Sequence, residues 1–189
     1  FLKENQKLIP LEKLYRQNTG RSLALSLVEF PEVPDRIRYT VEQVEKYTGL
    51  HNFGEYLTAM VELDAFFLNE DRHTNNIAVL YDTEKDCYEL SPIFDQGLSL
   101  LADTSFDFSL ERPLEECMRQ VEAKPFHLSF EQQVDAAEEL YGIQIHFHFG
   151  MKVVQEELKM LKEGYAEEVI MRVECLLREQ MRRYAYLMD

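Results

Sequence analysis

The stretch Leu68-Asn-Glu-Asp-Arg-His-Thr-Asn-Asn-Ile-Ala-Val-Leu80 gathers two acids, a basic pair and three amides between two apolar runs. The run before it, residues 53–68, is apolar nearly all round, which is typical of a buried helix, and Asn52 can cap that helix. The run after it, residues 77–80, is short enough for a strand. We therefore expect the most buried element of the fold to hold the polar loop around Asp71.

A second acidic stretch, Leu90-Ser-Pro-Ile-Phe-Asp-Gln-Gly97, follows closely. Residues 77–80 and 88–90 are expected to form a hairpin with residues 82–86 as its turn, which would bring Asp95 beside Asn76. Phosphoryl transfer needs a carboxylate that accepts the proton of the attacking hydroxyl, and it needs oxygen ligands that hold magnesium on the phosphates. The acid, amide and second acid of these two stretches match that need. The plainer interpretation is a polar loop with surface acids.

The composition limits the class of protein. A length of 189 residues with 46% hydrophobic residues suits one domain or one large lobe. The formal net charge of −15 argues against direct contact with nucleic acid and against an anionic membrane as a partner. The three cysteines lie far apart and no apolar run is long enough to span a bilayer, so we expect a cytoplasmic protein.

The N-terminal quarter carries weaker patterns. Residues 1–20 are helix-permissive, and residues 22–30 mix alternation with small residues in the manner of a strand. Thr40-Val-Glu-Gln43 has the form of a capping box, which predicts a short helix that ends near Gly49.

Beyond residue 98 the chain is expected to be mainly helical, and Ser129 is expected to cap a helix that ends near Tyr141. Residues 151–162 and 165–187 are also expected to be helical. His146 and His148 alternate as in a strand, which places both imidazoles on one face. A metal site would need further ligands, and none stands at a telling spacing.

Taken together, Asp71-Arg-His-Thr-Asn-Asn76 and Ser91-Pro-Ile-Phe-Asp95 resemble the C-terminal lobe of HipA-like serine/threonine kinases. The resemblance is best over residues 53–140, where Lys124-Pro-Phe126 and the helix from Ser129 also look like that family. It implies a mainly α fold with a short β-hairpin, that is, a protein-kinase-like C-terminal lobe of the α+β class. We expect one such domain over residues 1–189, with residues 1–40 as a hinge or linker from an absent N-terminal lobe.

The resemblance also implies roles for individual residues, with ATP and Mg²⁺ as cofactors. Asp71 would be the catalytic base, and Asn76 and Asp95 would be the magnesium ligands. His73 would belong to the nucleotide-binding residues, where it supports the loop and takes no part in the chemistry. Leu27 and Glu29 would lie on a hinge strand that meets adenine. Arg72 is expected to pair with a nearby acid rather than with phosphate.

The function expected from this resemblance is ATP- and Mg-dependent phosphoryl transfer to Ser or Thr of a protein substrate. The same Asp-Arg-His-x-x-Asn loop occurs in phosphatidylinositol-kinase-like enzymes, so a lipid or small-molecule kinase of the same fold is an alternative. The sequence has no glycine-rich phosphate loop and no strand lysine with a helix glutamate partner. A non-catalytic kinase-like binding or regulatory module is therefore a second alternative. The resemblance is also consistent with a partner protein, either one that supplies the N-terminal lobe or one that resembles an antitoxin.

Overall fold

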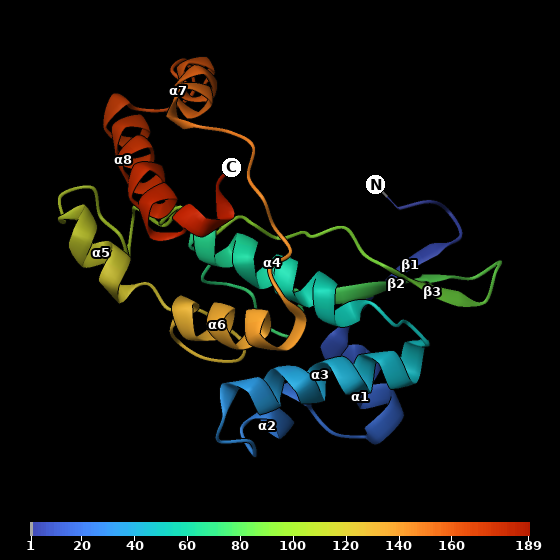
Figure 1. Ribbon diagram of the computed structural model, residues 1–189. Helices are drawn as coiled ribbons and strands as arrows, with labels where there is room; N and C mark the ends of the chain where they lie inside the picture. Colours follow the sequence, from blue (N-terminus) through green and yellow to red (C-terminus); the bar gives the residue numbers. More distant parts are fainter. Residues whose placement is uncertain (1) are drawn as a thin grey trace.

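The computed structural model describes residues 2–189, so Phe1 of the expected domain lies outside it, and Figure 1 shows its arrangement. Most of the described elements are helices, and one small antiparallel sheet accompanies them, which confirms the expected fold class. In chain order the elements are β1 (Gln6–Pro10), α1 (Leu11–Thr19), α2 (Leu23–Leu27), α3 (Val33–Thr48), α4 (Phe53–Phe67), β2 (Ala78–Asp82), β3 (Cys87–Leu90), α5 (Leu114–Gln120), α6 (Phe130–Tyr141), α7 (Met151–Met160), α8 (Glu167–Arg183) and the 3-10 helix η1 (Ala185–Leu187).

Helix α4 is the centre of the fold, as its apolar composition predicts. It packs against α3 and α6, and the sheet and α8 lie toward its two ends in Figure 1. At its N-terminal end, Gly54 faces the Tyr141 ring so closely that a Cβ atom there would lie 2.4 Å from the ring carbons. At its C-terminal end, Leu68 has a φ of 53°, which turns the chain sharply into the loop that carries Asp71.

The sheet confirms the predicted hairpin and adds a strand to it. Strands β2 and β3 pair antiparallel, and β1 pairs antiparallel with the other edge of β2. The predicted helix over residues 1–20 is therefore wrong in its first half, because residues 6–10 pair with β2 instead. Pairing with a neighbouring strand overrides the weak helical preference of such a short segment. Helix α1 begins directly after Pro10.

The predicted strand over residues 22–30 is also wrong, because residues 23–27 form helix α2. The Ser22 hydroxyl accepts a hydrogen bond from the Leu25 backbone N–H and caps this helix. Leu23 and Leu27, four residues apart, are buried, whereas Leu25 is 73% exposed. That burial pattern has the period of a helix, and the alternation of leucines in the sequence concealed it.

Helix α3 is longer than expected. It begins at Val33, with Pro34 in its first turn, rather than at the capping-box pattern of residues 40–43. Thr40 lies inside the helix, where its hydroxyl donates to the Arg36 carbonyl at 2.9 Å. The predicted end is correct: Gly49 closes the helix with a φ of 75°.

The C-terminal helices follow the prediction closely. The Ser129 hydroxyl caps α6 by accepting from the Gln132 N–H. Helix α8 is anchored to α4, because the Gln180 side-chain amide donates to the carbonyls of Ala65 at 2.7 Å and Phe66 at 3.1 Å. Within residues 2–189, no helix combines the length and the apolar character needed to cross a bilayer.

Glu62 is a buried carboxyl group on α4 that accepts the backbone N–H groups of Gln144 and Ile145. Burial raises its pKa from the ordinary 4.5 to about 7, and nearby Glu138 adds to this increase. The unfolded chain therefore releases this proton at lower pH than the folded chain does. The stabilisation is present below pH about 4.5 and is lost as the pH rises through about 7.

Glu62→Gln is expected to remove this part of the pH dependence, because the amide keeps an acceptor oxygen but cannot ionise. In urea unfolding, the variant should gain stability relative to wild type as the pH is raised from about 5 to about 8. Glu139→Gln, at an exposed position on the neighbouring helix α6, is the control and should show no such gain. The same pH dependence in wild type and Glu62→Gln would contradict this assignment.

Candidate active site

The loop that follows α4 is fixed to the start of α1. The backbone N–H of Leu11 donates to the Ile77 carbonyl at 2.8 Å. The Thr74 hydroxyl donates to the Glu12 carboxylate at 3.2 Å, and that carboxylate also accepts the N–H groups of Leu23 and Ala24. Thr74 and Asn76 are buried. The second half of the loop is therefore held by the N-terminal helices.

Arg72 holds the first half of the loop from inside the core, where it is only 1% exposed. Its guanidinium donates to both carboxylate oxygens of Asp64 on α4, at 2.6 and 2.9 Å. Its Nη1 atom donates to the carbonyls of Asn76 and Phe94, both at 2.7 Å. The prediction that Arg72 pairs with an acid is confirmed, and the same side chain ties the Asp71 loop to the segment that carries Asp95.

Two amide side chains complete this arrangement. Asn69 and Gln96 donate to the Asp64 carboxylate at 2.9 and 3.0 Å, and Asn69 Nδ2 also lies 3.4 Å from the Asp95 carbonyl. Asp64, Asn69 and Gln96 were not among the site residues predicted from the sequence. The available signal was an acid inside an almost wholly apolar helix, because a buried carboxylate requires a cation and hydrogen-bond donors nearby.

The half-buried Asp71 carboxylate lies among three polar side chains. Asn76 Nδ2 lies 3.3 Å from Asp71 Oδ2 and donates to the Asp71 carbonyl at 2.9 Å. His73 Nε2 lies 3.7 Å from the same carboxylate oxygen. Lys124 Nζ, from the distant segment between α5 and α6, lies 3.6 Å from Asp71 Oδ1. This lysine is a site residue that the sequence analysis missed.

His73 also supports the loop through its backbone and its ring. Its ring nitrogen Nδ1 accepts the Asn75 backbone N–H at 3.3 Å, and its carbonyl accepts the Asn76 N–H at 2.8 Å. A neutral imidazole that accepts at Nδ1 carries its proton at Nε2, which faces Asp71. These contacts suit the propping role expected for His73.

Asn76 and Asp95 present oxygen atoms that suit a hard cation. The Asn76 amide donates through Nδ2, and within residues 2–189 no hydrogen bond occupies its Oδ1 atom. Asp95 is exposed with a φ of 60°, and no hydrogen bond or ion pair in the described chain engages its carboxylate. Magnesium uses one or two protein oxygen ligands together with phosphates and waters, so this donor set fits magnesium.

The two residues expected on an adenine hinge strand do not lie on a strand. Leu27 is buried in the core on α2, and Glu29 is exposed and paired with Arg21. Neither residue has the strand geometry expected for an adenine hinge.

His146 and His148 both face Asp189 on the surface, as the prediction of one shared face requires. Among residues 2–189, no three His, Cys, Asp or Glu side chains are placed to hold a metal ion.

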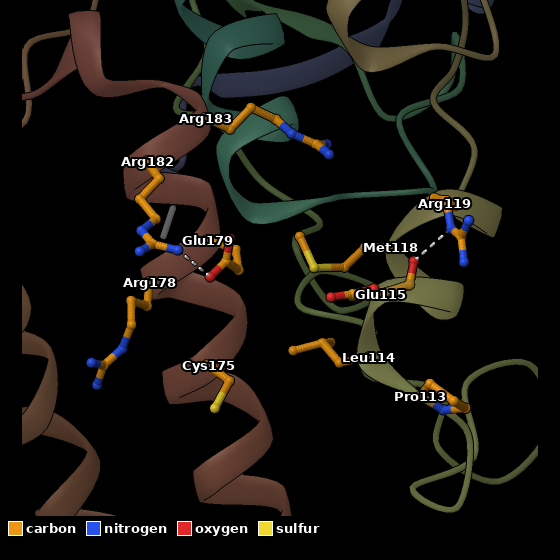
Figure 2. A pocket seen from close by; sticks show the side chains of 10 residues that line it. All are labelled: Pro113, Leu114, Glu115, Met118, Arg119, Cys175, Arg178, Glu179, Arg182 and Arg183. Carbon is orange, nitrogen blue, oxygen red and sulfur yellow. Dashed lines mark hydrogen bonds and ion pairs between the residues drawn. The ribbon is translucent and has the colours of Figure 1, made fainter.

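A separate cavity of about 1060 Å³ lies between α5 and α8 (Figure 2). Leu114 and Met118 line one wall, and Cys175 and Glu179 line the other. Arg178 and Arg182 project from α8 away from α5 in Figure 2, and they pair with Glu174 and Glu179. Since this cavity shares no residue with the cluster around Asp71, the cluster remains the candidate active site.

Comparisons with known proteins support the fold. No family model and no curated protein matches the chain. The crystal structure of CtkA, a proinflammatory kinase of Helicobacter pylori, matches it with a TM-score of 0.63 and 15% sequence identity. The match covers 96% of this chain and 70% of that chain. The chain therefore has a kinase-like fold.

Arg72→Met is expected to lower the free energy of unfolding by about 3–5 kcal/mol, because it leaves the buried Asp64 carboxylate without its cation. Urea unfolding measures the loss. Arg178→Met removes an exposed arginine that pairs with Glu174 on the same helix, and it should cost at most about 1 kcal/mol. Equal losses in the two variants would show that the Arg72–Asp64 pair is not a structural anchor.

Proposed function

We propose that this chain transfers a phosphoryl group from Mg-ATP to a Ser or Thr hydroxyl of a protein substrate, in the manner of the HipA-like kinases it resembles. The observation that carries the proposal is the shared donor Arg72 Nη1, which places the Asn76 and Phe94 backbones beside one another. An acid, an amide and a second acid thereby lie on two loops with a common anchor. The kinase-like fold and the description of the similar structure as a kinase add support.

Asp71 acts as the base in this proposal. Its carboxylate is partly exposed, so a substrate hydroxyl can reach it, and Asn76 and His73 restrict its orientation. A correctly oriented carboxylate positions the hydroxyl oxygen for attack and accepts its proton. The loop contributes geometry more than covalent chemistry, which is what phosphoryl transfer requires of a protein.

Asn76 and Asp95 would hold magnesium through Asn76 Oδ1 and the Asp95 carboxylate. When bound, magnesium neutralises charge on the phosphates and orients them. The buried Arg72 holds the backbones of both segments but takes no part in nucleotide contact, because it is only 1% exposed and four of its five N–H donors are engaged within the protein.

The substrate class is part of the proposal. A net charge of −15 disfavours an anionic lipid surface and favours a protein over a phosphoinositide acceptor. The test offers phosphoinositide vesicles and a mixture of proteins together with radiolabelled ATP. Label that appears only in the lipid would overturn the preference for a protein substrate.

Asp71→Asn is expected to reduce phosphoryl transfer about a hundred- to ten-thousandfold while nucleotide binding persists, because the amide cannot accept the proton. Transfer is measured with radiolabelled ATP, and binding is measured by calorimetry. Asp135→Asn, at an exposed position on α6, is the control and should retain both properties. Transfer at the wild-type rate by Asp71→Asn would remove Asp71 as the base.

Asp95→Ala is expected to abolish the magnesium-dependent part of ATP binding, because it removes the carboxylate ligand from the metal. Calorimetric titrations with ATP in magnesium and in EDTA separate that part from binding that needs no metal. Asp135→Ala should behave as wild type. Identical magnesium dependence in Asp95→Ala and wild type would contradict the assignment of Asp95 as a ligand.

A further inference from the structure

Lys124 lies beside Asp71 although more than fifty positions separate them in the sequence. Its ammonium nitrogen is 3.6 Å from Asp71 Oδ1. The side chain belongs to the segment between α5 and α6, on neither of the two loops that carry Asp71 and Asp95. A third part of the chain therefore contributes a cation to the candidate active site.

The backbone on both sides of Lys124 is firmly held. Ala123 is buried, and its N–H donates to the Leu128 carbonyl at 2.8 Å. Phe126 is also buried; its N–H donates to the Gln133 side chain at 3.0 Å, and its carbonyl accepts from Arg36 at 2.6 Å. These anchors hold the base of the Lys124 side chain near Asp71 without help from the ion pair itself.

The ion pair contributes little to folding. The side chains of Lys124 and Asp71 are 48% and 31% exposed, and exposed pairs of this kind add little stability because water and salt screen them. The anchors around Ala123 and Phe126 already fix the segment. Folding therefore does not explain why the ammonium group lies beside Asp71, and a role in the chemistry at Asp71 would explain it.

The surroundings of Lys124 are acidic. Glu70 lies next to Asp71, and its pKa is raised by burial and by the carboxylates of Asp107 and Asp103, while Lys124 opposes the increase. A nucleotide triphosphate would bring further negative charge into this region. A partly exposed ammonium group at that place is suited to offset the repulsion, since lysine binds phosphate as a compact point charge.

We propose that Lys124 is a catalytic residue that contacts the transferring γ-phosphoryl group, an inference that rests on the proposed kinase function. Asp71 accepts the proton of the substrate hydroxyl, whose oxygen forms the new bond to the γ-phosphorus. The bond from that phosphorus to the β–γ bridging oxygen breaks, and its electron pair leaves with ADP. Because Asp71 must lie near the attacked phosphorus, Lys124 is within side-chain reach of the γ-phosphoryl oxygens. Its ammonium group donates N–H groups to these oxygens.

The test compares two nucleotides that differ in the γ-phosphate. Calorimetry in magnesium measures binding of ADP and of the non-hydrolysable ATP analogue AMP-PNP to wild type, Lys124→Met and Lys124→Arg. We expect Lys124→Met to weaken AMP-PNP binding about ten- to a hundredfold and to leave ADP binding unchanged. Lys124→Arg should recover most of the lost affinity. Lys152→Met, an exposed lysine on α7, is the control and should change neither affinity.

Three other outcomes distinguish the role of Lys124 from the proposed kinase function. Wild-type affinities for both nucleotides in Lys124→Met would overturn the role of Lys124 and leave the proposed kinase function standing. An equal loss for ADP and AMP-PNP would also overturn it, because that result marks a structural effect on the site. A wild-type chain that binds neither nucleotide would overturn the proposed function and this inference together. Circular dichroism melts confirm that the compared variants are folded.

Discussion

The buried ion pair between Arg72 and Asp64 is the constraint on which the rest of the site depends. Two charges in an apolar core lose their hydration, and their attraction offsets that cost only where good geometry and further hydrogen bonds satisfy both groups. Here the side-chain amides of Asn69 and Gln96 donate further hydrogen bonds to the carboxylate. The guanidinium in turn donates to the backbone carbonyls of Asn76 and Phe94. This one buried pair thereby fixes the positions of two loops, and it holds the exposed Asp95 carboxylate and the half-buried Asp71 carboxylate on a rigid support.

The parts that could be predicted from the sequence are those with strong local signals. The apolar run of α4, the hairpin turn at residues 82–86 and the Ser129 cap each identify their element without knowledge of the rest. The spacing of Asp71, Asn76 and Asp95 around that hairpin also indicated that two loops would meet. Arg72 was correctly expected to pair with an acid, because a cation next to a buried helix rarely stays unpaired.

The parts that could not be predicted depend on distant contacts. Residues 6–10 form a strand because β2 offers an open edge about seventy positions later. The alternating leucines of residues 23–27 fit a strand or a helix, and burial against α1 and α3 selects the helix, so no hinge strand forms around Leu27 and Glu29. Lys124 meets Asp71 only through the packing of Ala123 and Phe126, which no local pattern around Asp71 reveals.

We propose that the Asp71 loop and the Asp95 segment form one metal–nucleotide site. The most direct measurement replaces magnesium with paramagnetic Mn²⁺ in the presence of ATP and follows the backbone amide resonances of the chain by NMR. We expect resonances of residues 71–76 and 94–97 to broaden together at low Mn²⁺ concentration, while those of residues 146–148 stay sharp. Broadening of only one of the two segments, or broadening that begins elsewhere in the chain, would contradict it.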